Sequence, residues 1–140
     1  MNRYTFDECY VGMYESFMTD VSESKMQEFL DITGDVNPLH NNADYAKLQG
    51  FDDRVVYGLL TTSFFSTLAG VYLPGERCLI QEVDYKYVKP VYVGDKLNVS
   101  GEVVEKDDRT RQLRLKVRIK RVSDDATVVR GAMTVGVLTD

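Results

Sequence analysis

The residues best suited to acid–base chemistry lie in one short stretch, residues 35–40, which reads DVNPLH. His40 is the only histidine of the chain, and the ordinary titration of histidine lies near neutral pH. Asp35 precedes it in a loop that Pro38 stiffens. A carboxylate and an imidazole held close together can share and move the protons of a bound water. The alternative is that Asp35 caps the turn and His40 is a partly exposed loop residue, and the two residues alone favour that structural role.

Other catalytic chemistries lack the residues that they need. A zinc site requires three or four ligands, usually at short spacing, whereas the chain offers one histidine and two distant cysteines, Cys9 and Cys78. Phosphate-binding loops of the GxxxxGK or GxGxxG type are absent, and so is the GxSxG nucleophile elbow. We therefore expect no metal and no cofactor, and we interpret both cysteines as reduced, buried small side chains.

A long apolar stretch is predicted to form the helix that organises the fold. Residues 59–72, LLTTSFFSTLAGVY, carry no charge, and their apolar side chains cover most of a helical wheel, which is typical of a buried helix. The stretch is too short, and too rich in Thr and Ser, to span a bilayer. Gly58 precedes it, and Pro74-Gly75 ends it with a turn signal. The helix should begin at Gly58, where free backbone N–H groups would point back towards the chemistry.

The first part of the chain is predicted to hold a strand followed by two helices, one before and one after the Asp35–His40 loop. Ser22 is a suitable N-cap, and Gly34 supplies a C-terminal stop. A second stop signal is Gly50, which follows a short amphipathic stretch. The predicted elements are a strand over 14–18, a helix over 23–33, a short helix over about 43–48 and a loop over 51–56.

After Pro74-Gly75 the hydrophobic period changes from helical to alternating, which is typical of half-buried strands. Four such strands joined by short turns predict an antiparallel meander with one wet face, and the apolar helix is the available cover for the dry face. Gly101 is a possible bulge. The alternating segments are 83–87, 97–103, 113–119 and 129–137, with turns at 107–108 and 123–125. The fold class is therefore α+β, an antiparallel sheet wrapped around a central apolar helix, in a single domain over 1–140.

Composition and charge exclude several classes of protein. The chain has 140 residues, 44% of them hydrophobic, which suits one packed core and not a disordered segment. The net charge of −5 argues against a general nucleic-acid binder. Neither a signal peptide nor a transmembrane run is evident, so we expect a cytoplasmic protein. One predicted strand has a cationic face, which we interpret as exposed to solvent. The alternative is that part of it contacts a phosphate-bearing carrier. The face comprises Arg111, Arg114, Lys116, Arg118 and Lys120.

One long segment resembles a known family. The run GDVNPLHNNADYAKLQGF, followed by VVYGLL, is similar to the MaoC-like hot-dog hydratases, in particular the (R)-specific enoyl-CoA hydratases. The downstream LPG turn and the KPVYVGD segment at 89–95 resemble the family too. The resemblance covers about 22–104, and less distinctly the last two strands. It implies a hot-dog fold and a hydro-lyase that adds water to trans-2-enoyl thioesters, or removes it from (R)-3-hydroxyacyl thioesters.

The resemblance also implies roles for particular residues. Asp35 and His40 fall on the catalytic pair of the family, which would hold the reacting water. Gly58 falls on the glycine whose N–H holds the thioester carbonyl oxygen, and Ser66 on a helix serine that assists there. Asn37 falls on an asparagine that orders the loop.

The same resemblance leaves substrate and partners open. Tyr57 replaces the usual histidine before the glycine, and Leu59 the usual methionine, which bears on pocket shape. The thioester carrier is either CoA or acyl carrier protein, and the family implies a homodimer. Two other functions stay open: a non-catalytic acyl-thioester-binding module, which the change at Tyr57 allows, and a hot-dog thioesterase, which would place a carboxylate on the central helix.

Overall fold

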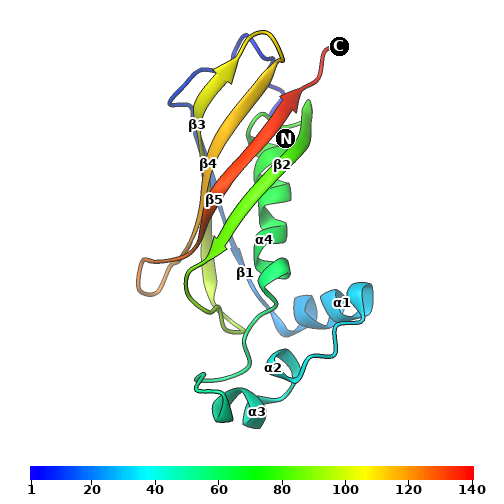
Figure 1. Ribbon diagram of the computed structural model, residues 1–140, viewed down its shortest axis with the longest axis vertical. Helices are drawn as coiled ribbons and strands as arrows, with labels where there is room; N and C mark the ends of the chain where they lie inside the picture. Colours follow the sequence, from blue (N-terminus) through cyan, green and yellow to red (C-terminus); the bar gives the residue numbers. More distant parts are fainter.

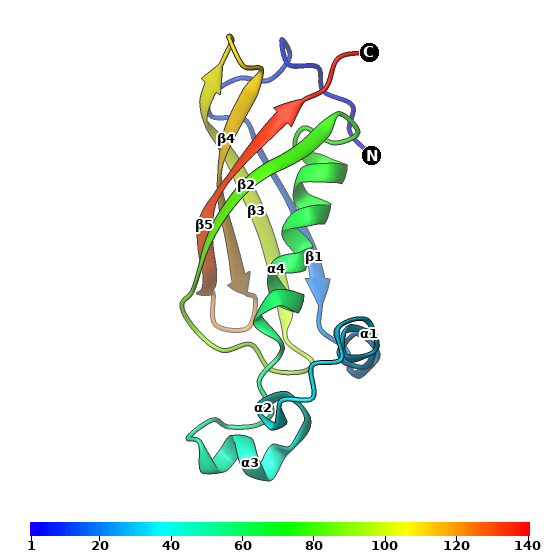
Figure 2. The ribbon, with the colours of Figure 1, turned by 45° about the vertical axis from the view of Figure 1, so that its right-hand side comes forward.

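A curved five-stranded antiparallel sheet wraps around one central helix, and three further helices lie beyond one end of the sheet (Figures 1 and 2). The computed structural model describes all of residues 1–140. Its elements are β1 (Tyr14–Asp20), α1 (Glu23–Thr33), α2 (Pro38–Asn41), α3 (Ala43–Leu48), α4 (Gly58–Thr67), the π-helical η1 (Leu68–Tyr72), β2 (Cys78–Tyr87), β3 (Lys96–Asp107), β4 (Gln112–Arg121) and β5 (Ala126–Val137). None of the helices combines the length and the hydropathy that crossing a bilayer requires.

The three predicted helices are confirmed, whereas α2 forms within a segment that was predicted as a loop. Local capping explains the bounds of α1. The Ser22 hydroxyl accepts a hydrogen bond from the Lys25 N–H, and Gly34 ends α1 at a φ of 70°, a left-handed conformation that glycine adopts without steric cost. The predicted helix over 59–72 is observed as α4 and η1 together. In η1 the backbone hydrogen bonds span five residues instead of four, and the Leu73 N–H, which donates to the Leu68 carbonyl at 2.8 Å, closes its C-terminal end.

The strand order is β1-β3-β4-β5-β2, so the prediction of a four-strand meander is wrong for β2. Strands β3, β4 and β5 do form a meander, but β2 pairs with β5, and Tyr87 lies opposite Val129. The chain then crosses, over residues 88–95, from one edge of the sheet to β3 (Figure 1). Hydrophobic alternation identifies a strand but carries no information about its neighbour, which is why the sequence did not reveal this crossing.

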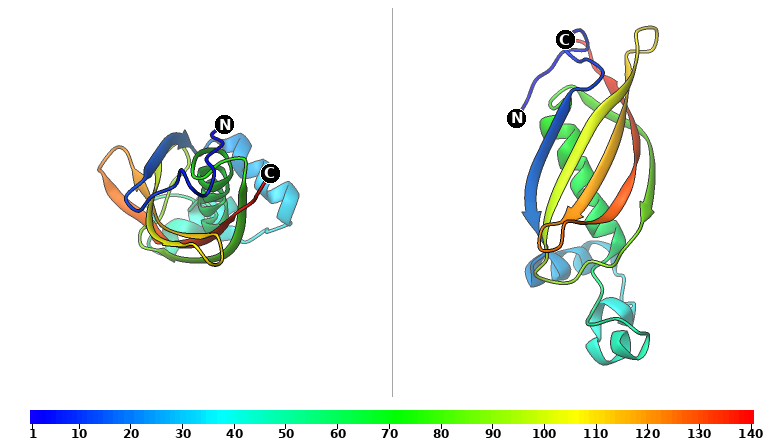
Figure 3. Two further views of the ribbon diagram at one scale, coloured as in Figure 1. Left: turned by 90° about the horizontal axis from the view of Figure 1, so that it is seen from above. Right: turned by 90° about the vertical axis from the view of Figure 1, so that its left-hand side faces the viewer.

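The core lies between α4 and the concave face of the sheet, where Figure 3 shows the strands curling around the helix. The prediction of a bulge at Gly101 is wrong. The pairing of β3 with β4 is regular there and shifts only between Val103 and Glu105. A Cβ at Gly101 would lie 2.9 Å from Leu68 Cδ2. Glycine at this point therefore lets the helix approach the sheet closely.

One face of α4 is not covered within a single chain, so the prediction that this helix is buried all round is wrong for the isolated subunit. Leu59 is 69% exposed, and Ser63 and Ser66 are exposed as well. The edge strand β2 shows the same feature. Ile80, Val83 and Tyr87, which lie opposite buried residues of β5, are 40–51% exposed. We call Leu59, Ile80, Val83 and Tyr87 the uncovered apolar face.

Candidate active site

The DVNPLH stretch folds as two consecutive side-chain-capped turns. Asp35 Oδ1 accepts a hydrogen bond from the Asn37 N–H at 3.0 Å, and Asn37 Oδ1 accepts one from the Leu39 N–H at 3.0 Å. Asn37 is the N-cap of α2, and Pro38 occupies its first turn, where the missing N–H of proline costs nothing. This short, capped helix carries His40 on its last turn.

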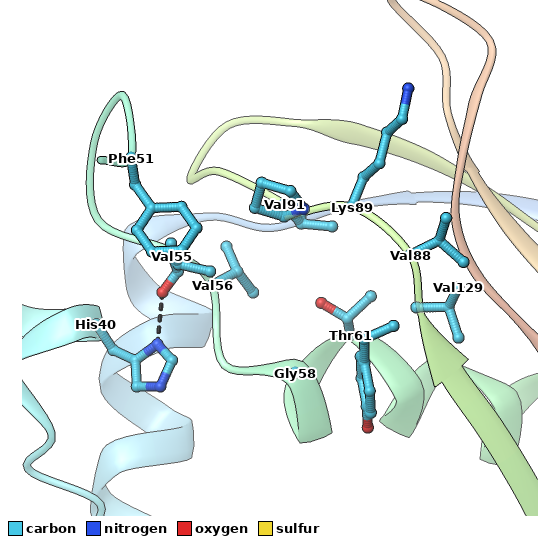
Figure 4. Close-up of a pocket in the computed structure, with 12 residues that line it drawn as sticks. His40, Phe51, Val55, Val56, Gly58, Thr61, Val88, Lys89, Val91 and Val129 are labelled. Atoms are coloured by element: carbon cyan, nitrogen blue, oxygen red, sulfur yellow. Dashed lines mark hydrogen bonds between the residues drawn. The ribbon is translucent and has the colours of Figure 1, made fainter. Parts of the chain in front are cut away.

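The His40 imidazole is oriented by contacts on two sides. Its Nδ1 lies 2.6 Å from the carbonyl oxygen of Val55, drawn as the dashed line in Figure 4. A carbonyl can only accept, so Nδ1 carries the proton, and Nε2 of the neutral ring is left with a free lone pair. The ring also packs against Tyr57, with centroids 4.2 Å apart. His40 is therefore held in the tautomer that a general base requires.

A cavity of about 290 Å³ opens between His40 and the first turn of α4 (Figure 4). Gly58 and Thr61 of α4 line it together with His40, and the crossing segment 88–91 forms another wall. Most of the remaining lining is apolar, as in small-molecule sites generally. These lining residues are Phe51, Val55, Val56, Tyr87, Val88, Lys89, Pro90, Val91 and Val129.

The helix end that faces this cavity has no side-chain cap. The first backbone bond of α4 runs from the Thr61 N–H to the Tyr57 carbonyl at 3.1 Å, so the N–H groups of residues 58–60 have no partner within the helix. No side chain caps α4, whereas side chains do cap α1, α2 and α3. The Tyr87 ring packs on Gly58, where an added Cβ would lie 2.9 Å from Tyr87 Cε1. The cavity thus adjoins unpaired donors at the positive end of a helix dipole.

The structure brings together two of the five residues predicted at the site. His40 and Gly58 both line the cavity, and Asn37 caps the helix that carries His40. Asp35 does not line it: its side chain is exposed and its Oδ1 caps the turn, as in the structural alternative weighed from the sequence. Ser66 is exposed on α4 and does not line the cavity either.

Sequence reasoning did not identify most of the cavity wall. Phe65, which is fully buried, belongs to the core, and the Tyr85 ring packs on it with centroids 4.8 Å apart. Phe51 and Tyr87 line the cavity instead. The sequence did mark Tyr87 as the last residue of an alternating strand shortly before Pro90. Hydrophobic alternation could not predict, however, that the chain crossing after β2 brings Tyr87 to α4.

The thiols of the chain are poor nucleophiles. Burial raises the pKa of the Cys78 thiol to about 11, and it also raises the pKa of Cys9. The thiolate is the reactive form of cysteine, so neither side chain is activated. Both cysteines are free. The structure contains no cluster of three or more His, Cys, Asp or Glu side chains that could hold a metal ion.

Comparison with known proteins finds similar sequences and similar folds. The chain is 33% identical over 110 residues to the 3-hydroxybutyryl-CoA dehydratase of Methylorubrum extorquens, covering 79% of this chain and 70% of that protein. It is 33% identical over 105 residues to the (R)-specific enoyl-CoA hydratase of Rhodospirillum rubrum, covering 72% and 73%. The structure superposes with a TM-score of 0.89 on the unliganded R-hydratase PhaJ1 of Pseudomonas aeruginosa, at 27% identity, covering 97% of this chain and 86% of that one.

The family assignment follows from these matches. The superposition confirms the predicted α+β hot-dog fold. A model of the family described as MaoC like domain matches residues 13–137, which is nearly the whole chain. This chain therefore belongs to the MaoC-like domain family.

Proposed function

We propose that this protein is a hydro-lyase that adds water to trans-2-enoyl thioesters, or removes it from (R)-3-hydroxyacyl thioesters. The observation that carries the proposal is that a correctly oriented imidazole and an uncapped helix N-terminus adjoin one mainly apolar cavity. An enoyl chain suits the apolar wall, and a thioester carbonyl suits the free amides. The names of the relatives support the same reaction class.

The chemistry assigns a task to each group. His40 Nε2 accepts a proton from a water molecule as the water oxygen bonds to C3 of the enoyl chain. The electron pair of the C2=C3 bond moves towards the carbonyl, and the oxygen gains negative charge. The Gly58 N–H, at the positive end of α4, stabilises that charge. Transfer to C2 of the proton that His40 Nε2 took from the water completes the 3-hydroxyacyl product and restores the neutral imidazole, and no redox partner is needed.

Asp35 is the second proposed proton-transfer group, and its assignment depends on the loop. Only Oδ1 of its carboxylate is used by the turn, so Oδ2 is available to a water shared with His40. A task in the reaction requires the Asp35 side chain to rotate towards the cavity, which it does not line in this structure, while the Tyr57 bond holds its backbone carbonyl in place. Ser66 has no task within one chain, because its hydroxyl is exposed outside the cavity; a role for it requires a second subunit.

The test is a hydration assay with matched variants. Purified protein is mixed with crotonyl-CoA, the loss of enoyl absorbance is followed, and the product is identified with dehydrogenases specific for the (R) or (S) alcohol. We expect (R)-3-hydroxybutyryl-CoA from the wild type, and losses of at least about a thousandfold in His40→Gln and Asp35→Asn, in line with removal of a proton-transfer group and its water. Lys47→Gln, an exposed change on α3 outside the cavity, should retain full activity.

The same assay separates the competing functions. Release of free thiol from the thioester would indicate a thioesterase, although α4 and η1 contain no Asp or Glu to serve it. Binding of crotonyl-CoA without turnover would indicate a non-catalytic acyl-binding module. Comparing the CoA ester with the same acyl group on acyl carrier protein identifies the preferred carrier.

We also propose that the working unit is a homodimer formed through the uncovered apolar face. Strand β2 is an unpaired edge, and exposed edges with apolar side chains tend to pair with another strand. The exposed Leu59, Val83 and Tyr87 would be covered by the same surface of a second copy. Light scattering should give twice the mass of one chain, and Val83→Glu should give single chains. A wild type that stays monomeric at assay concentrations would contradict this.

A further inference from the structure

Tyr57 is a buried polar residue at the junction between the catalytic loop and α4. Its side chain is 2% exposed, and it does not line the cavity. It is the N-cap residue of α4, yet its side chain makes no capping bond. Its hydroxyl and its ring must therefore serve something other than the helix end or the substrate.

The Tyr57 hydroxyl contacts both ends of the segment that carries His40, and its single proton lies between two acceptors. It lies 2.9 Å from the backbone carbonyl oxygen of Asp35, to which it donates, and 3.2 Å from Asn41 Oδ1. Asp35 begins the capped turn before α2, and Asn41 ends α2. One buried hydroxyl therefore contacts the first and the last residue of a seven-residue segment that is otherwise mostly exposed.

The Tyr57 ring supports the imidazole directly. Its centroid is 4.2 Å from that of His40 and 4.7 Å from that of Phe29 on α1, with ring planes tilted by 33° and 40°. On its other side His40 is bonded to the carbonyl of Val55, two residues before Tyr57. The imidazole is thus held by the same backbone segment that runs directly into Gly58.

We infer that Tyr57 is a positioning residue that sets the distance between His40 and the Gly58 amide. The inference rests on the proposed function for its catalytic consequence. Because Tyr57 and Gly58 are consecutive, a bond from the Tyr57 hydroxyl to the loop fixes the imidazole relative to the amide without contact with the substrate. Small displacements of a catalytic group reduce turnover strongly, by about a hundredfold for an error of 1 Å.

The kinetic test is Tyr57→Phe, which keeps the ring and removes only the hydroxyl. We expect kcat for crotonyl-CoA to fall by roughly ten- to a hundredfold, while KM changes by less than about twofold because the cavity wall is intact. Asn41→Ala removes the second acceptor together with the bond from Asn41 Nδ2 to the Asn37 carbonyl at 3.2 Å. It should give a smaller fall in kcat because the Tyr57–Asp35 bond remains. Tyr4→Phe is the matched control: it removes a hydroxyl bonded to Glu15 at 3.1 Å, away from the cavity, and should leave kcat unchanged.

A spectroscopic test does not depend on activity. His40 is the only histidine, so long-range proton–nitrogen NMR spectra report its tautomer without assignment. The wild type should show the neutral ring protonated at Nδ1, as the Val55 bond requires. Tyr57→Phe should show a mixture of tautomers or exchange broadening, and Tyr4→Phe should match the wild type.

The outcomes separate this inference from the proposed function. An inactive wild type whose imidazole signal still changes in Tyr57→Phe would refute hydratase activity but support positioning. Unchanged kcat and an unchanged imidazole signal in Tyr57→Phe would overturn the inference, and so would a loss of activity confined to KM. If Tyr57→Phe does not fold, Asn41→Ala decides: wild-type kcat and a wild-type imidazole signal in that variant would overturn it.

Discussion

Replacing Gly58 by alanine should separate catalysis from stability. The added Cβ would lie 2.9 Å from Tyr87 Cε1, whereas ordinary van der Waals contact begins at 3.4 Å, so the Tyr87 ring must retreat by about 0.5 Å. In the single chain Tyr87 is 51% exposed and lies on an edge strand, so it can move there, and stability is therefore compared in the Val83→Glu background that is expected to be monomeric. Its hydroxyl is 3.1 Å from Thr62 Oγ1, and this retreat is enough to break that hydrogen bond.

The expected change in stability is small because two effects oppose each other. Loss of the Tyr87–Thr62 hydrogen bond costs about 1 kcal/mol at most, since water can replace Thr62 at a half-exposed hydroxyl. Alanine in place of glycine stabilises a helix by about 0.4–1 kcal/mol through the unfolded state. We therefore expect the Tm of Gly58→Ala to lie within about 5 °C of the wild-type value.

The expected change in activity is large. The Cβ would stand beside the amide, at the point where the carbonyl oxygen must approach the helix end, and loss of one such donor typically costs about a hundredfold or more in kcat. The assay is crotonyl-CoA hydration at matched folded concentration. Gly70→Ala is the control within the same helical stretch, because a Cβ there meets nothing within 4 Å. If Gly58→Ala retains more than a tenth of wild-type kcat/KM, the oxyanion role of Gly58 is refuted.

Two further changes probe the cavity and the core. Tyr87→Ala removes the aromatic wall beside Gly58. With a panel of enoyl-CoA substrates, we expect relative kcat/KM to shift about tenfold or more towards longer acyl chains. An unchanged preference would mean that the end of the acyl chain lies away from Tyr87. Burial raises the pKa of the Cys78 thiol from 9.0 to about 11, so the unfolded chain loses this proton first. The protonated Cys78 thiol therefore makes its full contribution to the free energy of unfolding below about pH 9, and this contribution is lost as the pH rises towards about 11. Urea unfolding should show a decrease in the free energy of unfolding over this pH range, and the decrease should be smaller in Cys78→Val.

Local elements were predictable because their signals are local. The α1 boundaries follow from a serine hydroxyl at one end and a left-handed glycine at the other, and both act within one turn. The strands β3 to β5 follow from alternation, which a half-buried sheet imposes on each strand separately. The position of β2 was missed because pairing depends on residues far away in the sequence.

The candidate site also has a part that could be predicted from local sequence and a part that could not. The sequence singled out His40 and Gly58 as candidates because a histidine after an Asn-Pro turn and a glycine before an apolar helix are recognisable without knowledge of the fold, and the family resemblance supplied their expected roles. It did not reveal that Asp35 turns its Oδ1 to the backbone, or that Ser66 stands outside the cavity. The orientation of a side chain depends on its neighbours in space, and those neighbours are fixed only when the segments pack.

The sequence alone determined three of the helices, the strands and the α+β class, and it singled out His40 and Gly58, which line one cavity. The tertiary structure alone decided that the crossing segment after β2 meets the start of α4, which closes the cavity, and that Tyr57 and the Val55 carbonyl together hold the imidazole. The physical reason is range: capping and hydrophobic period act over a few residues, whereas a cavity and an oriented base are made by segments that only the folded core brings together.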